Sequence, residues 1–177
     1  MSFSPYTPAL TVVAETVSTG RLSWPGGTLP CVLGRAGIRT DKREGDGATP
    51  AGLFPLRRVL WRQDRLPAPA TALPLAPINP DDGWCDDPAD VAYNRPVSLP
   101  YPARHERLWR DDHLYDVVVV LGHNDDPVVA GAGSAVFLHL AAADGSPTAG
   151  CVALAPADLL AVLARCRPGD ALRIDAG

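Results

Sequence analysis

The stretch Asp116–Gly122, with the sequence DVVVVLG, does most to determine the fold of this chain. Its four consecutive valines are β-branched, and a run without polar alternation is typical of a strand that is buried on both faces. A second run, AVFLHL over Ala135–Leu140, has the same character. We therefore expect Asp116–Gly122 to be the central strand of a sheet and Ala135–Leu140 to be a second buried strand.

Proline and glycine punctuate the rest of the chain. The sequence has 19 Pro and 16 Gly in 177 residues, a composition that shortens helices and favours brief strands joined by turns. Shorter strands are expected at 10–17, 21–24, 28–33, 53–61 and 171–174. One amphipathic helix is expected from Pro156, with its apolar side formed by Leu159, Leu160, Val162, Leu163 and Cys166. The sequence thus predicts a mainly β (α+β) fold with one C-terminal helix.

Two segments interrupt the predicted strands. Turn-forming residues over Arg39–Gly52 indicate a long loop, and five prolines fall within Pro67–Pro80. The second segment could be a linker between domains, but each half would then fall below about 100 residues, so we favour a loop within a single domain over residues 1–177. For Arg104–Asp112 we expect one or two exposed helical turns.

Charge and hydropathy exclude several classes of partner. Against 16 Lys plus Arg stand 20 Asp plus Glu, for a net charge of −4, so nucleic acid is an improbable partner. The least polar stretch, Pro127–Ala143, is 17 residues long and is broken by proline and glycine, which predicts no membrane span. The chain as given begins without a basic region followed by an apolar run, so we expect no export signal in it.

His139 and Cys151 stand at the two ends of one turn-rich connection, Leu140–Gly150. A thiol attacks a carbonyl as the thiolate, and its ordinary pKa of about 8.5 leaves little thiolate at neutral pH. A neighbouring imidazolium could lower that pKa by about two units, so we expect His139 to activate Cys151. Gly150 would let a substrate carbonyl approach main-chain N–H donors. The alternative is that Cys151 is one more small buried residue before the helix.

Further candidates flank this pair. Trp84, close to Tyr93 and Asn94, could line a sugar or peptide groove, or it could pin a loop by packing on the core. His123 and Asn124 follow the central strand and could contact substrate or orient water, or they could be exposed strand-end residues. Cationic residues could favour an acidic peptide or be ordinary surface charges: Lys42, Arg43, Arg104, Arg107 and Arg110.

The number and spacing of the cysteines favour neither disulfide bonds nor a metal site. Four cysteines, Cys31, Cys85, Cys151 and Cys166, could form two disulfides, but a domain of this length does not need them, so we favour free thiols. No Cys-x-x-Cys or His-x-x-x-His pattern occurs, and a zinc site would need ligands from four distant segments. We therefore expect neither a metal nor a cofactor.

Three segments together carry a family pattern. They are Gly45–Phe54 (GDGATPAGLF), Gly131–His139 (GAGSAVFLH) and Pro147–Leu154 (PTAGCVAL), and they span about 60% of the chain. This pattern resembles the L,D-transpeptidase catalytic domain, the YkuD family, in which a histidine precedes a Ser/Thr-His-Gly-Cys motif. Ala149 stands where many members have a second histidine, which marks an offshoot, while Thr148 keeps the hydroxyl position.

The resemblance implies a mixed β-sandwich fold and a site without a cofactor. Cys151 would be the nucleophile and His139 the general base, with oxyanion donors around Gly150 and substrate contacts at Thr148. Ser134, Asp144 or a main-chain carbonyl could orient His139.

The resemblance also implies a reaction. The thiolate would attack the third residue of a peptidoglycan stem tetrapeptide and form a thioester, which an amine would convert to a crosslink or water would hydrolyse. A carbapenem is the expected inhibitor. The family implies a periplasmic or cell-envelope location, with the cytoplasm as the alternative. Other thiol amidases or acyltransferases, a non-catalytic peptidoglycan-binding module and a structural metal protein remain alternatives.

Overall fold

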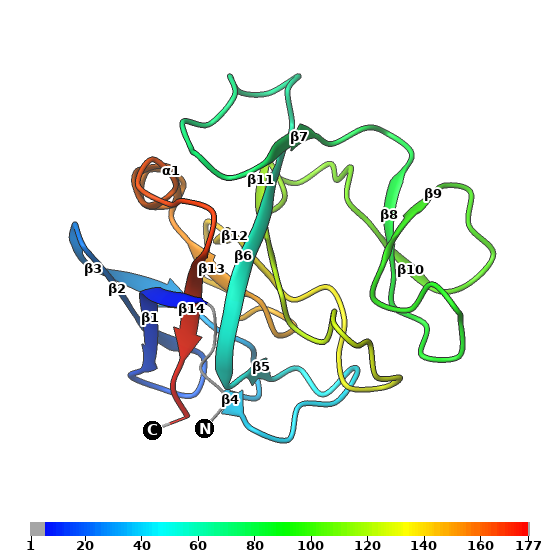
Figure 1. Ribbon diagram of the computed structural model, residues 1–177, viewed down its shortest axis with the longest axis horizontal. Helices are drawn as coiled ribbons and strands as arrows, with labels where there is room; N and C mark the ends of the chain where they lie inside the picture. Colours follow the sequence, from blue (N-terminus) through cyan, green and yellow to red (C-terminus); the bar gives the residue numbers. More distant parts are fainter. Residues whose placement is uncertain (1–5, 177) are drawn as a thin grey trace.

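The computed structural model describes residues 6–176 (Figure 1). The strands are β1 (Thr7–Ala14), β2 (Thr19–Trp24), β3 (Gly27–Val32), β4 (Ile38–Arg39), β5 (Thr49–Pro50), β6 (Gly52–Trp61), β7 (Leu75–Pro77), β8 (Asp82–Cys85), β9 (Pro96–Ser98), β10 (His105–Arg107), β11 (Val117–Leu121), β12 (Phe137–Leu140), β13 (Val152–Leu154) and β14 (Asp170–Ile174). Helix α1 covers Pro156–Leu163. The mainly β prediction with one C-terminal helix is therefore confirmed.

The largest sheet closes on itself. Its strands follow the order β11-β12-β13-β3-β2-β1-β14-β6-β7, and β6 also pairs with β11, so that only β7 lies outside the ring. β6 achieves this because its first half pairs with β14 and its second half with β11. A register irregularity between Val120 and Leu121 of β11 accompanies the change. Closure removes the exposed edges that an open sheet of short strands would leave.

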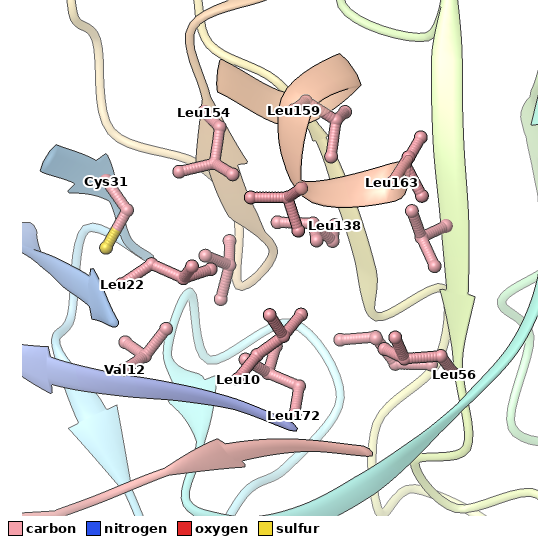
Figure 2. Close-up of a cluster of buried hydrophobic side chains, with 14 of the residues drawn as sticks. Leu10, Val12, Leu22, Cys31, Leu56, Leu138, Leu154, Leu159, Leu163 and Leu172 are labelled. Atoms are coloured by element: carbon pink, nitrogen blue, oxygen red, sulfur yellow. The ribbon is translucent and has the colours of Figure 1, made fainter. Parts of the chain in front are cut away.

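The first hydrophobic core fills the inside of this ring. Leucine side chains from strands on all sides converge there, and Leu159 and Leu163 of α1 enter the same cluster (Figure 2). Pro156 occupies the first turn of α1, where its missing N–H costs no hydrogen bond. Within residues 6–176, no helix has the length and apolar character needed to cross a membrane.

A second hydrophobic core lies on the other face of β11. The segment between β7 and β11 folds into a three-stranded sheet in the order β10-β8-β9, which stands beside β11 in Figure 1. Trp84 of β8 packs edge-on against Phe137 of β12, with ring centroids 5.2 Å apart. All five residues of β11 are buried because cores press on both of its faces, as the valine run predicted.

The structure corrects two expectations about local structure. Arg104–Asp112 is not helical: it contains β10, and Leu108 just after that strand is buried. These residues form a strand because they pair with β8 in an antiparallel register, a contact that the local sequence does not reveal. Leu160 was expected on the apolar side of α1 but is 38% exposed, and Cys166 is buried beyond the end of the helix.

Neighbouring leucines of α1 allow a matched stability test. Leu159 is fully buried in the first core, whereas Leu160 faces solvent. We expect Leu159→Ala to lower the free energy of unfolding by about 2–5 kcal/mol, because it leaves a cavity. Leu160→Ala should lower it by less than about 1 kcal/mol. Urea denaturation of both variants measures the difference, and equal effects would contradict the packing of α1 described above.

Candidate active site

The pairing of β12 with β13 places His139 and Cys151 on one face. The two strands are parallel, with Leu138 opposite Val152 and His139 opposite Ala153. Side chains alternate along a strand, and Leu138 and Val152 belong to the first core inside the ring. His139 on β12 and Cys151 just before β13 therefore point to the other side, toward the three-stranded sheet.

A cavity of about 630 Å³ opens at this position. His139 and Cys151 both line it, together with Tyr115, Thr148 and Gly150. Both candidate side chains are largely buried, with 5% of His139 and 8% of Cys151 exposed. Cys151 is thus not sealed in hydrocarbon: it contacts the second core and also borders the cavity.

A main-chain carbonyl orients the imidazole. The Nδ1 atom of His139 lies 2.8 Å from the carbonyl oxygen of Leu140. Because a carbonyl only accepts hydrogen bonds, Nδ1 carries the proton and Nε2 is left as a free base. Ser134 and Asp144, the other candidates for this role, are occupied elsewhere: Ser134 donates to Glu44, and Asp144 accepts from Ser146.

The Cys151 thiol is bonded within the strand framework. Its Sγ donates to the carbonyl oxygen of Ala135 at 3.3 Å and accepts the N–H of Phe137 at 3.3 Å. A donating Sγ is protonated, so this geometry belongs to the neutral thiol rather than the thiolate. The N–H of Phe137 could also donate a hydrogen bond to the thiolate form of Cys151.

The ionisation states differ from the expected ion pair. Burial raises the pKa of Cys151 to about 12, and burial lowers the pKa of His139 to about 4. Both groups are therefore neutral at pH 7, and the predicted imidazolium does not exist in the free protein. The expectation failed because it counted the attraction between the two charges and neglected the cost of removing both from water.

Two charged residues of the cavity act on the thiol in opposite directions. The Glu106 carboxylate adds to the increase in the Cys151 pKa, whereas the Lys42 ammonium opposes it. Lys42 is nearly buried, pairs with Asp46 and donates to the carbonyl oxygen of Arg43. Its field favours negative charge on the sulfur or on a nearby oxyanion.

The turn before Cys151 requires glycine and uses Thr148 internally. Gly150 has a φ of +143°, and a Cβ there would lie 2.7 Å from the carbonyl oxygen of Ala48. Thr148 Oγ1 accepts the N–H of Gly150 at 3.1 Å and donates to the carbonyl oxygen of Cys151 at 2.7 Å. The Gly150 N–H is thus occupied in the free protein, and the oxyanion role of Gly150 and the substrate role of Thr148 stay predictions. Ala149 lines the same cavity.

His123 and Asn124 do not line this cavity. His123 Nε2 bonds the carbonyl oxygen of Ala132 at 3.0 Å, and its ring packs edge-on against Phe54. Asn124 has a φ of +49° and bonds the main chain of Val129 through both ends of its amide. These side chains hold the loop between β11 and β12, and their predicted contact with substrate stays a prediction.

Trp84 also lies outside this cavity, in keeping with the alternative that it pins a loop. Its Nε1 donates to Asn94 Oδ1 at 3.0 Å, and its ring belongs to the second core. Asn94 Oδ1 also accepts the N–H of Ala135, while its Nδ2 donates to the carbonyl oxygen of Asn124. This buried amide connects the three-stranded sheet to the residues that contact the Cys151 sulfur.

The cationic candidates divide between the cavity and the surface. Lys42, Arg104 and Arg110 line the cavity, whereas Arg43 and Arg107 do not. Sequence analysis missed Arg35, which also lines the cavity. Its main-chain N–H donates to the carbonyl oxygen of Thr148. No run of charge or motif marks it.

The remaining cysteines are buried thiols that show no metal-binding arrangement within residues 6–176. Cys31, Cys85 and Cys166 are buried free thiols, as is Cys151. Burial raises the pKa of Cys31 and of Cys166 to about 12. Among residues 6–176, no group of three or more His, Cys, Asp or Glu side chains is arranged to hold a metal ion.

Sequence analysis also missed Tyr115 and Glu106. The Tyr115 ring packs edge-on against His139, with centroids 5.2 Å apart, and its hydroxyl donates to Glu106 Oε1 at 2.7 Å. A tyrosine directly before the central strand could have suggested a side chain near that strand's end. No local signal in the sequence indicates that Glu106 lines a cavity, since the pattern of Arg104–Asp112 predicts exposed helical turns.

A thiol and an oriented imidazole that share one open cavity on a closed β framework form a candidate site for acyl transfer. Comparison with protein families supports this class, since the YkuD model, the L,D-transpeptidase catalytic domain, matches residues 11–174. The chain belongs to this family, which is a family of transpeptidases that act on peptidoglycan. Searches of curated proteins and of solved structures gave no significant match.

The buried imidazole predicts a specific acid sensitivity. His139 has a pKa of about 4 in the folded protein, against 6.5 for a free histidine, so the unfolded chain takes up the proton first as the pH falls. Its contribution to the free energy of unfolding is thus fully present above pH 6.5 and declines toward pH 4, by about 3 kcal/mol at most. Urea denaturation at several pH values measures this for wild type and His139→Asn. The wild type should lose more stability than the variant over this window, and parallel curves would contradict a neutral buried His139.

Proposed function

We propose that this protein is a cysteine-dependent L,D-transpeptidase or L,D-carboxypeptidase with Cys151 as nucleophile and His139 as general base. The observation that carries the proposal is the orientation of His139 by the Leu140 carbonyl, which leaves Nε2 unprotonated in the cavity that Cys151 lines. Membership in the YkuD family supports the reaction class.

Acylation in this proposal begins from two neutral groups. As Sγ of Cys151 attacks the carbonyl carbon of the third residue in a stem tetrapeptide, His139 Nε2 takes the thiol proton. The C–N bond to the terminal D-alanine then breaks, and His139 returns that proton to the leaving amine. General-base removal of the proton during attack fits the raised thiol pKa better than a preformed thiolate does.

Deacylation reverses the same proton path. An amine or a water attacks the thioester carbonyl and gives its proton to His139, the C–S bond breaks, and the sulfur is reprotonated. An amine yields a crosslink and water yields a trimmed peptide. The main-chain N–H of Cys151, for which the described residues provide no acceptor outside the strand ladders, is our candidate oxyanion donor.

The Lys42 ammonium would support both steps. It lines the cavity, and a Cβ built on Gly150 would lie 3.6 Å from its Nζ. A fixed positive charge at this place stabilises an oxyanion formed beside Gly150 and a transient thiolate.

A carbapenem tests the nucleophile directly, because its strained amide acylates an accessible thiol. We expect intact-mass analysis to show one adduct on the wild type and none on Cys151→Ala. Cys85→Ala serves as the matched control, since Cys85 is also buried but does not line the cavity, and it should keep the adduct. An unmodified wild type after prolonged exposure would support a non-catalytic peptidoglycan-binding module instead.

Removal of the base should slow acylation without unfolding the protein. We expect His139→Ala to reduce the rate of carbapenem acylation by about two to four orders of magnitude, because the thiol keeps its proton. Stopped-flow or timed mass spectrometry measures this rate, and circular dichroism checks the fold. A near-wild-type rate would remove His139 from the mechanism. Digestion of muropeptides followed by mass spectrometry then separates crosslinking from trimming.

A further inference from the structure

Glu106 places a carboxylate in the cavity beside the reacting groups. It lies on β10, lines the cavity with Cys151 and His139, and accepts the Tyr115 hydroxyl on Oε1. Its second oxygen, Oε2, accepts no hydrogen bond from the described residues. Burial raises the Glu106 pKa, which means that the charged carboxylate is poorly solvated where it stands.

Neither Arg35 nor the other cations of the cavity form an ion pair with Glu106, although the Arg110 guanidinium opposes the rise in the Glu106 pKa. Arg104 pairs with Asp86 at 3.1 Å and Arg110 with Asp112 at 2.6 Å, while Lys42 pairs with Asp46. Among residues 6–176, Glu106 makes no ion pair. Glu44, another carboxylate of the cavity, already accepts the hydroxyls of Tyr93 and Ser134.

Tyr115 connects the carboxylate to the catalytic pair. Its hydroxyl donates to Glu106, and its ring meets the edge of His139. Burial raises the Tyr115 pKa well above its ordinary value, so the hydroxyl keeps its proton and holds Glu106 in place. The Glu106 charge also reaches the sulfur, because it contributes to the raised pKa of Cys151.

We propose that Glu106, held by Tyr115, binds a primary ammonium group of the peptide substrate inside the Cys151 cavity. A cation fits this position because it gives the unpartnered Oε2 a charge-assisted hydrogen bond and offsets the desolvation of the carboxylate. It would also screen the negative field that disfavours the thiolate, so that binding the correct substrate eases attack by the sulfur.

The inference rests on the proposed function, and the ammonium has two sources within it. One is the side chain of the donor's third residue, next to the carbonyl that is attacked. The other is the amine of the acceptor before it loses its proton. Both present the same chemistry, so the experiment has one arm for each.

The donor arm measures binding without catalysis. Cys151→Ala protein is titrated by calorimetry with two tetrapeptides that differ only in the third residue, lysine or Nε-acetyllysine. A charge-assisted hydrogen bond predicts about 10- to 100-fold tighter binding of the lysine peptide. Adding Glu106→Gln should bring the ratio below about threefold, because glutamine keeps an acceptor for Tyr115 but lacks the charge. Adding Glu15→Gln instead, at an exposed carboxylate outside the cavity, should preserve the ratio.

The acceptor arm uses the active protein and the acetyllysine donor. Transfer to glycinamide, a cation at neutral pH, is compared with transfer to methoxyamine, which is neutral. If the acceptor supplies the ammonium, Glu106→Gln lowers the glycinamide-to-methoxyamine ratio by about tenfold or more. The ratio in this arm cancels any change that Glu106→Gln causes in the intrinsic reactivity of Cys151.

A charge preference lost on Glu106→Gln in either arm supports the site and identifies its source. Ratios that Glu106→Gln leaves unchanged in both arms overturn it. Failure of the proposed function is distinguished by the carbapenem adduct. If Cys151 is unreactive, the binding arm alone applies, and equal affinity for the two tetrapeptides then overturns the inference.

Discussion

The parallel pairing of β12 with β13 is the constraint on which the site depends. It sets a register in which His139 and Cys151 share the face that is turned away from the first core. A shift of one residue in either strand would reverse that strand's side chains and bury one of the two groups inside the ring. Closure of the ring through β6 and β11 fixes this register, because neither β12 nor β13 is a free edge.

The second constraint is the withdrawal of the site from water. Burial keeps Cys151 and His139 neutral in the free protein, and the Leu140 carbonyl fixes the tautomer that leaves Nε2 free. In the proposed mechanism, charge therefore arises during the reaction rather than before it. Lys42 and Glu106 act on that charge with opposite signs, so the chemistry of the cavity depends on what occupies it.

The three-stranded sheet forms the side of the cavity that the closed sheet does not provide. It contributes Glu106 to the cavity and seals the second core through Trp84. Asn94 joins this sheet to Ala135, whose carbonyl oxygen accepts a hydrogen bond from the Cys151 thiol. A proline-rich, turn-rich region of the sequence is thus ordered by buried hydrogen bonds, and it contributes Asp86, Arg104, His105, Glu106 and Arg110 to the lining of the cavity.

The sequence by itself predicted the strands β1, β2, β3, β6, β11, β12 and β14, the single C-terminal helix and the candidate pair His139 and Cys151. These follow from hydrophobic runs, from proline and glycine, and from a family motif, all of which are local in the chain. Only the tertiary structure decided the closure of the ring, the β10 strand where helical turns were expected, and the partners of His123 and Trp84. It also decided the ionisation of the thiol and the position of Glu106, because desolvation and charge proximity depend on segments that are distant in the chain and meet only when it folds.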